Sequence, residues 1–209
     1  MWLTKILETF GETHLYIVDK GCFEICNLII ANVDNKNPIY HKDNQLGVMH
    51  GKTTFHRAAE LGHIEICKLF IDNLADKNPC DDFRITPLHA AARSGHLEVC
   101  RLLMENILDK NPRISNGLTP LHLAALGGHL ELYRLILGNT KVKTPEDVDG
   151  CTPLHCAAMN GHFYICEFIL EHVDEKNPIN NMGTTPRSLA FRRGYLNIAD
   201  LIDNHLRKM

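Results

Sequence analysis

One feature constrains the fold more than any other: five similar segments recur at a fixed spacing of 33 residues. They begin at Thr53, Thr86, Thr119, Thr152 and Thr185, and three of them read Thr-Pro-Leu-His followed by one variable residue and Ala-Ala. Self-similarity at this period marks a stack of equivalent units, each of which contacts only its neighbours. The sequence therefore predicts a solenoid, and solenoids mostly bind other molecules.

Each segment carries the start and stop signals of a helix. Threonine suits the N-cap, and proline at the first helical position loses nothing by lacking an N–H. A glycine ends each segment, as expected for a left-handed residue past a helix C-terminus: Gly62, Gly95, Gly128, Gly161 and Gly194. Apolar residues at spacings of three and four then follow, which predicts a second helix in every unit.

The repeated pattern Thr-Pro-Leu-His-x-Ala-Ala-x-x-Gly-His resembles the ankyrin repeat family, and the resemblance covers nearly the whole chain. It implies an all-α ankyrin-repeat solenoid of stacked helix-turn-helix units with short β-hairpin or turn fingers. We expect one array over residues 1–209. Its parts are an irregular N-terminal capping unit 1–38, a long inserted finger loop 39–52, repeats 53–79, 80–112, 113–145 and 146–178, and a C-terminal capping repeat 179–209.

The two ends and one finger depart from the pattern. Leu3, Ile6, Leu7 and Phe10 predict an amphipathic helix that covers the first repeat. The last repeat has Arg187 and Ser188 where the others have leucine and histidine, and polar substitution suits a terminal cap. Capped ends favour a self-contained array. Arg84 stands where other fingers have glycine, so we expect a different turn there, since a positive φ at arginine costs roughly 1 kcal/mol.

Composition narrows the classes of partner and compartment. The net charge of −3 gives no global basic footprint, so nucleic acid is not an expected partner. The absence of an 18-residue apolar run argues against direct membrane insertion, and Glu8 interrupts any secretory apolar segment. Cysteine shares one repeat position with Tyr133 and Ala199, which indicates packing rather than disulfides. We expect a reducing compartment, the cytoplasm, with the nucleus as the alternative.

The abundant histidines and cysteines do not predict chemistry. His56, His89, His122 and His155 recur at one helical position, and helices pack about 8–10 Å apart, too far for equivalent histidines to share a metal ion. In the ankyrin family this histidine is structural. Successive helical side chains diverge by about 100°, so His155 and Cys156 do not form a nucleophile pair. Cys80 and Cys151 fall in predicted turns and are expected to be the more reactive thiols. No nucleotide-binding or hydrolase motif occurs. We expect no enzyme activity, no cofactor and no metal site.

In the ankyrin family, partners dock on the finger tips and the exposed edge of the first helix, on the concave face. Carried over position by position, this predicts a partner-binding set: Met49, His50, Phe83, Ile85, Arg93, Leu118, Leu126, Val148, Met159, Met182, Arg192 and Arg193. Most are apolar where a solvated finger tolerates polar residues, which favours a protein-binding patch. We predict a groove centred on Phe83, Leu118, Leu126 and Met159. The alternative is that Ile85 and Leu118 simply pack between neighbouring fingers.

The C-terminal end is locally basic, so the expected partner is another protein or a peptide segment with apolar anchors and an acidic end: the basic residues are Arg187, Arg192, Arg193, Arg207 and Lys208. We expect a monomer that serves as a non-enzymatic protein–protein interaction module: an adaptor, a scaffold or an inhibitor. The alternative is a regulatory or substrate-recruiting domain of a larger multidomain enzyme, channel or signalling protein. The inserted loop 39–52 either contributes to function or is merely tolerated.

Overall fold

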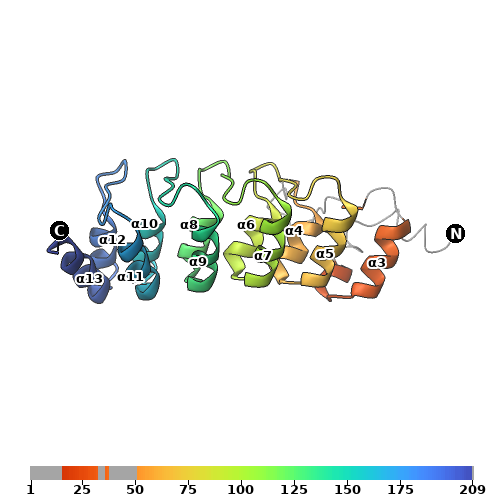
Figure 1. The fold of residues 1–209 in the computed structure, drawn as a ribbon, viewed down its shortest axis with the longest axis horizontal. Helices are drawn as coiled ribbons and strands as arrows, with labels where there is room; N and C mark the ends of the chain where they lie inside the picture. Colours follow the sequence, from red (N-terminus) through yellow and green to blue (C-terminus); the bar gives the residue numbers. More distant parts are fainter. Residues whose placement is uncertain (1–15, 33–35, 38–50, 209) are drawn as a thin grey trace, which may run out of the picture. The chain divides into compact units, whose positions relative to one another are not determined.

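The computed structural model describes residues 16–32, 36–37 and 51–208. The chain divides into two compact units, Met1–Asp109 and Lys110–Met209. Regular structure in the described residues is helical, and none of them lies in a β-sheet (Figure 1). The first unit contains α3 (Phe23–Asn32), α4 (Thr54–Leu61), α5 (Ile64–Asn73), α6 (Pro87–Ser94) and α7 (Leu97–Asn106). The second contains α8 (Pro120–Gly127), α9 (Leu130–Gly138), α10 (Pro153–Met159), α11 (Phe163–His172), α12 (Pro186–Arg192) and α13 (Leu196–Leu206).

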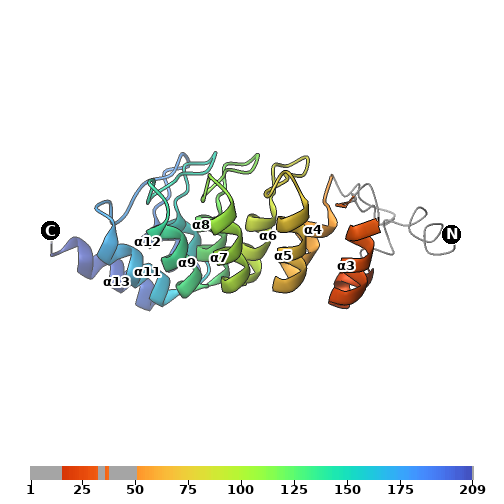
Figure 2. The ribbon, with the colours of Figure 1, turned by 45° about the vertical axis from the view of Figure 1, so that its right-hand side comes forward.

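The helices form stacked pairs within each unit. In the first unit α4 packs on α6, while α3 packs on α5 and α5 on α7. In the second unit α8, α10 and α12 form one row and α9, α11 and α13 the other (Figure 1; Figure 2 gives the turned view). The predicted all-α repeat solenoid of helix-turn-helix units is confirmed. The predicted array boundaries, 1–38, 39–52, the four repeats and 179–209, remain a prediction.

Helices α4, α6, α8 and α10 each begin with a capping box between threonine and the histidine three residues later. In α8 the Thr119 backbone N–H donates to His122 Nδ1 at 3.2 Å, and the Thr119 hydroxyl lies 3.0 Å from the same nitrogen. In α12 Ser188 replaces the histidine: its hydroxyl accepts from Thr185 N–H at 3.0 Å. The repeated histidine is therefore the structural residue that the family resemblance implied.

The Gly-His pair that follows α4, α6, α8 and α10 links consecutive repeats. Gly62 has a φ of 77°, and a Cβ there would lie 2.5 Å from His96 Nδ1. His96 Nε2 is 2.9 Å from the carbonyl oxygen of Glu60. In the second unit His162 packs on Gly128 in the same way and lies 2.9 Å from the oxygen of Leu126. Glycine is required for both its backbone conformation and its lack of a side chain.

The core between the helix rows consists of small and branched apolar side chains. The paired alanines, such as Ala124 and Ala125, are completely buried, which permits close helix packing. Cys67 and Cys166 occupy the same repeat position in the core, and burial raises the pKa of each thiol to about 12. All eight cysteines are free. These thiols act as small apolar side chains, as the sequence predicts.

Candidate protein-binding surface

The fingers are tight turns closed by backbone and side-chain hydrogen bonds. In the finger 146–151, Asp147 N–H donates to Cys151 O at 2.9 Å and Gly150 N–H donates to Asp147 O at 3.2 Å. Asp147 Oδ1 also accepts from the N–H groups of Asp149 and Cys151, at 2.9 and 2.8 Å. Asp81 and Asn180 play the same part in their fingers. The described fingers therefore take the turn form of the prediction, and not the β-hairpin form.

Histidines of the first helices hold the base of the next finger. His56 Nε2 lies 2.9 Å from Ile85 O, His122 Nε2 lies 3.0 Å from Cys151 O, and His155 Nε2 lies 3.1 Å from Thr184 O. A carbonyl oxygen only accepts, so Nε2 carries the proton, while Nδ1 accepts from threonine. Burial lowers the pKa of His122 to about 4 and lowers those of His56 and His155. The finger base is thus fixed by a neutral imidazole.

In the second unit the finger tips are also bonded to one another. Val148 N–H donates to Asn116 O at 3.0 Å, and Asn181 N–H donates to Asp149 O at 2.9 Å. A Cβ added at Gly117 would lie 2.8 Å from Val148 N, so the fingers are in direct contact. Side chains at these tips are therefore presented on a backbone that is already ordered.

Arg84 adopts the turn of the glycine fingers. Its φ is 63°, and it is the one non-glycine residue with positive φ in the part of the chain that the structure describes. The expectation of a different turn at this finger is wrong. The reason is that Asp81 Oδ1 accepts from both Phe83 N–H and Ile85 N–H, at 2.9 and 2.8 Å, which fixes the turn despite the strain at Arg84.

The predicted binding residues of the first unit differ in exposure. Phe83 at the finger tip is 48% exposed, Ile85 at the finger base is half-buried, and Arg93 at the end of α6 is exposed. Met49 and His50 lie outside the described residues, as do most of the loop 39–52 and the predicted helix around Leu3.

In the second unit the tips carry the most exposed apolar residues of the predicted set. Val148 is 60% exposed and Met182 72%. Three further apolar members are half-buried, one at the base of the finger 114–118 and two at the ends of α8 and α10: Leu118, Leu126 and Met159. Arg192 and Arg193 are exposed where α12 ends. The groove centred on Phe83, Leu118, Leu126 and Met159 has members in both units and remains a prediction.

Two further residues behave differently from expectation. Arg187 forms a two-pronged ion pair with Asp203, with nitrogen–oxygen distances of 2.6 and 2.8 Å, so it ties α12 to α13 and is not a free cation of the basic end. Cys151 is half-buried, its Sγ lies 3.2 Å from Asn180 Nδ2, and burial raises its pKa. Cys151 is therefore not fully exposed, and its reactivity relative to the buried thiols remains a prediction. Cys80 is exposed.

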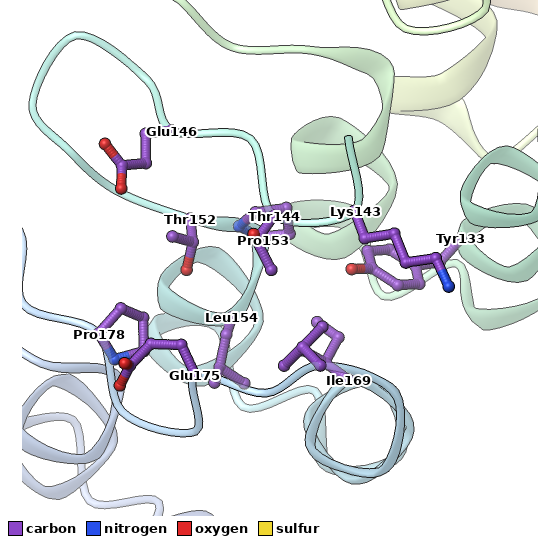
Figure 3. A pocket seen from close by; sticks show the side chains of 11 residues that line it. Tyr133, Lys143, Thr144, Glu146, Thr152, Pro153, Leu154, Ile169, Glu175 and Pro178 are labelled. Atoms are coloured by element: carbon purple, nitrogen blue, oxygen red, sulfur yellow. The ribbon is translucent and has the colours of Figure 1, made fainter. Parts of the chain in front are cut away.

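The structure also contains a cavity that the sequence interpretation missed. It lies in the second unit beside Tyr133, Thr144 and Leu154, and its volume is about 90 Å³ (Figure 3). The available signals were Tyr133 in place of cysteine and Thr144 in place of asparagine in the repeat pattern.

Across residues 16–32, 36–37 and 51–208, no three or more His, Cys, Asp or Glu side chains are grouped to hold a metal ion. None of the described helices is long and apolar enough to cross a membrane.

Comparison with known proteins agrees with the geometry of the helices and fingers. A family model described as ankyrin repeats (3 copies) matches residues 55–144 and 133–207. No curated protein sequence matches the chain.

Proposed function

The chain belongs to the ankyrin repeat family, and on this premise we propose that it is a non-enzymatic module that binds another protein through its fingers and first helices. Ankyrin repeats are generally protein–protein interaction modules. The roles that fit such a module are adaptor, scaffold and inhibitor. We place it in the cytoplasm, with the nucleus as the alternative, since the free buried cysteines suit a reducing compartment. We expect it to be a monomer.

The observation that carries the proposal is the row of exposed apolar side chains on fixed turns. Val148 and Met182 of the second unit lie on neighbouring fingers joined by the Asn181–Asp149 hydrogen bond. Association costs free energy for every side chain and loop that must be ordered. Because this backbone is already ordered, the apolar tips can be buried against a partner without that loop-ordering cost. Phe83 offers the same kind of anchor in the first unit.

Charge suggests the chemistry of the partner at one end of this surface. Arg192 and Arg193 are exposed at the end of α12, the helix that follows the finger carrying Met182. A partner segment with apolar residues and an acidic end would bury its apolar groups on the tips and pair its carboxylates with these guanidinium groups. The segment is expected to bind through a few anchors, as protein interfaces commonly do.

The test is affinity capture from cell lysate with the intact chain and two variants. A Val148→Glu, Met182→Glu double variant places charge on the finger tips. A Tyr164→Glu variant places a single added charge on α11, at a side chain that is 71% exposed and belongs to the other helix row. We expect a partner that binds wild type and Tyr164→Glu, and that loses about 2 kcal/mol or more of binding free energy to the double variant. Capture that is equal for all three folded chains would refute the assigned surface.

A further inference from the structure

The cavity of the second unit combines two departures from the repeat pattern at one place. It lies among α9, α10, α11 and the segments that follow α9 and α11, and its volume is about 90 Å³. Tyr133 of α9 and Thr144 of the following segment both line it (Figure 3). The equivalent positions hold cysteine and asparagine in most other repeats. The other repeats of this chain therefore serve as internal comparisons.

The first departure leaves a buried hydroxyl without a hydrogen bond. Tyr133 is fully buried, and its hydroxyl has no hydrogen-bond partner among the described residues. The hydroxyl end of the ring points toward Thr144 and Pro153 (Figure 3). A buried hydroxyl that makes no hydrogen bond is costly, so such a group calls for a partner.

The second departure removes a carboxamide. Asn111 Oδ1 accepts from Leu121 N–H at 3.0 Å, and Asn177 Oδ1 accepts from Arg187 N–H at 3.2 Å. Asn37 does the same for Phe55 N–H at 3.0 Å. Asn78 is the exception, because its Oδ1 is buried without a hydrogen-bond partner. Thr144 has no carboxamide, and the corresponding N–H, that of buried Leu154, donates to no described residue. Tyr133 and Leu154, which both line the cavity, therefore each have a donor without an acceptor among the described residues: a phenol O–H and a backbone N–H.

The charges at the cavity select a neutral group. Glu146 and Glu175 line it together with Lys143. An anion would be repelled by the two carboxylates, and a cation would meet two hydrogen-bond donors and an ammonium group. A primary carboxamide supplies an oxygen that accepts from Leu154 N–H and Tyr133 O–H, and an amide NH2 that donates to a carboxylate.

The size of the cavity agrees with a group of this kind. An engineered cavity of about 150 Å³ in another protein takes up benzene, so about 90 Å³ suits a ligand head group of about four or five non-hydrogen atoms. We propose that this cavity binds a primary carboxamide, carried either by a small neutral molecule or by an asparagine or glutamine side chain of a partner protein. The ligand supplies the hydrogen-bond acceptor that Asn111 and Asn177 supply in their own repeats.

The test is a titration of the isotope-labelled chain with propanamide, followed by the amide resonance of Leu154. A ligand of five non-hydrogen atoms has limited binding energy, so we expect a saturable shift at millimolar concentration. Propionate and butanone are the matched controls, because one adds a negative charge and the other removes the NH2 donor. We expect neither to saturate the Leu154 resonance in the same range. A Leu154 resonance that does not respond to propanamide, or responds equally to propionate, overturns the proposal.

Two variants separate binding from folding. Thr144→Asn gives the cavity its own carboxamide, so it should abolish the titration and raise the melting temperature. Tyr133→Phe removes only the hydroxyl and should weaken propanamide binding about tenfold, with the remaining amide spectrum unchanged. A Thr144→Asn chain that titrates like wild type overturns the proposal, as does a crystal soaked in propanamide that shows only water in the cavity.

The source of the carboxamide is distinguished by a second ligand. The short peptides Ala-Asn-Ala and Ala-Gln-Ala carry the same group on a polypeptide backbone. Saturation by a peptide at lower concentration than propanamide assigns the site to a partner side chain. Saturation by propanamide alone assigns it to a small molecule.

Discussion

Lowering the pH from 7.5 to 5.5 should destabilise the fold through the histidines that hold the finger bases. His122 is buried, accepts a hydrogen bond from Thr119 N–H at Nδ1 and donates from Nε2 to Cys151 O. A second proton would turn Nδ1 into a donor that faces another donor. The folded state therefore favours neutral His122.

The magnitude follows from the two pKa values of His122. The unfolded value is 6.5 and burial lowers the folded value to about 4. Between these limits the unfolded chain binds more protons, so the free energy of unfolding falls as the pH falls. The stabilisation is fully present above pH 6.5. At pH 5.5, one unit below the unfolded pKa, His122 alone costs about 1.4 kcal/mol. His56 and His155, whose pKa values burial also lowers, add in the same direction.

The assay is urea unfolding followed by circular dichroism at the two pH values, with a His122→Ser variant. Serine is the chain's own alternative at this position, because Ser188 maintains the capping bonds with Thr185. We expect the variant to be less stable at pH 7.5. Its further loss between pH 7.5 and 5.5 should be smaller than that of wild type by about 1.4 kcal/mol. An identical loss in both chains would refute the assignment of a neutral, hydrogen-bonded His122.

Two further predictions concern the fingers. Arg84→Gly should raise the free energy of unfolding by roughly 0.5–1 kcal/mol, since it relieves a positive φ at a non-glycine residue while loosening the unfolded chain; urea unfolding measures it, and a loss of stability would contradict the strain. Iodoacetamide should label exposed Cys80 well before Cys151, whose burial raises its pKa and limits access. Peptide mapping by mass spectrometry gives the order, and equal rates would contradict the burial of Cys151.

The helix ends and the buried positions could be predicted from the sequence, because the rules that set them are local and recur in every repeat. Thr119 and Gly128 each follow a helix-end rule that depends on neighbours within one repeat, and the 33-residue period confirms each rule several times. The recurrence of one position among Cys67, Cys166 and Tyr133 likewise predicts a buried side chain before any contact is known.

The errors arose where contacts beyond the local pattern decide the outcome. Arg84 has a side chain that disfavours a positive φ, yet two hydrogen bonds to Asp81 Oδ1 impose the turn. Cys151 lies in a turn, but the Asn180 side chain of the next finger lies against its sulfur. The base of a finger is therefore less exposed than its tip, where Val148 is 60% exposed. The sequence places Arg187 in the basic end, since the repeat pattern does not reveal that Asp203 on the other helix of the last pair is its partner.

At the candidate carboxamide site the sequence reveals two departures from the repeat pattern, but it does not reveal what they do together. Tyr133 alone looks like a larger core residue, and Thr144 alone looks like a tolerated change in an Asn-Pro turn. Only the fold places both beside the Leu154 N–H, where one change adds a donor and the other removes an acceptor. Asn37, Asn111 and Asn177 satisfy the equivalent N–H in their repeats, whereas Asn78 Oδ1 is buried without a hydrogen-bond partner. An unpartnered phenol hydroxyl and a backbone N–H without its carboxamide in one cavity are costly. A ligand whose acceptor reaches both Tyr133 O–H and Leu154 N–H would offset both costs at once.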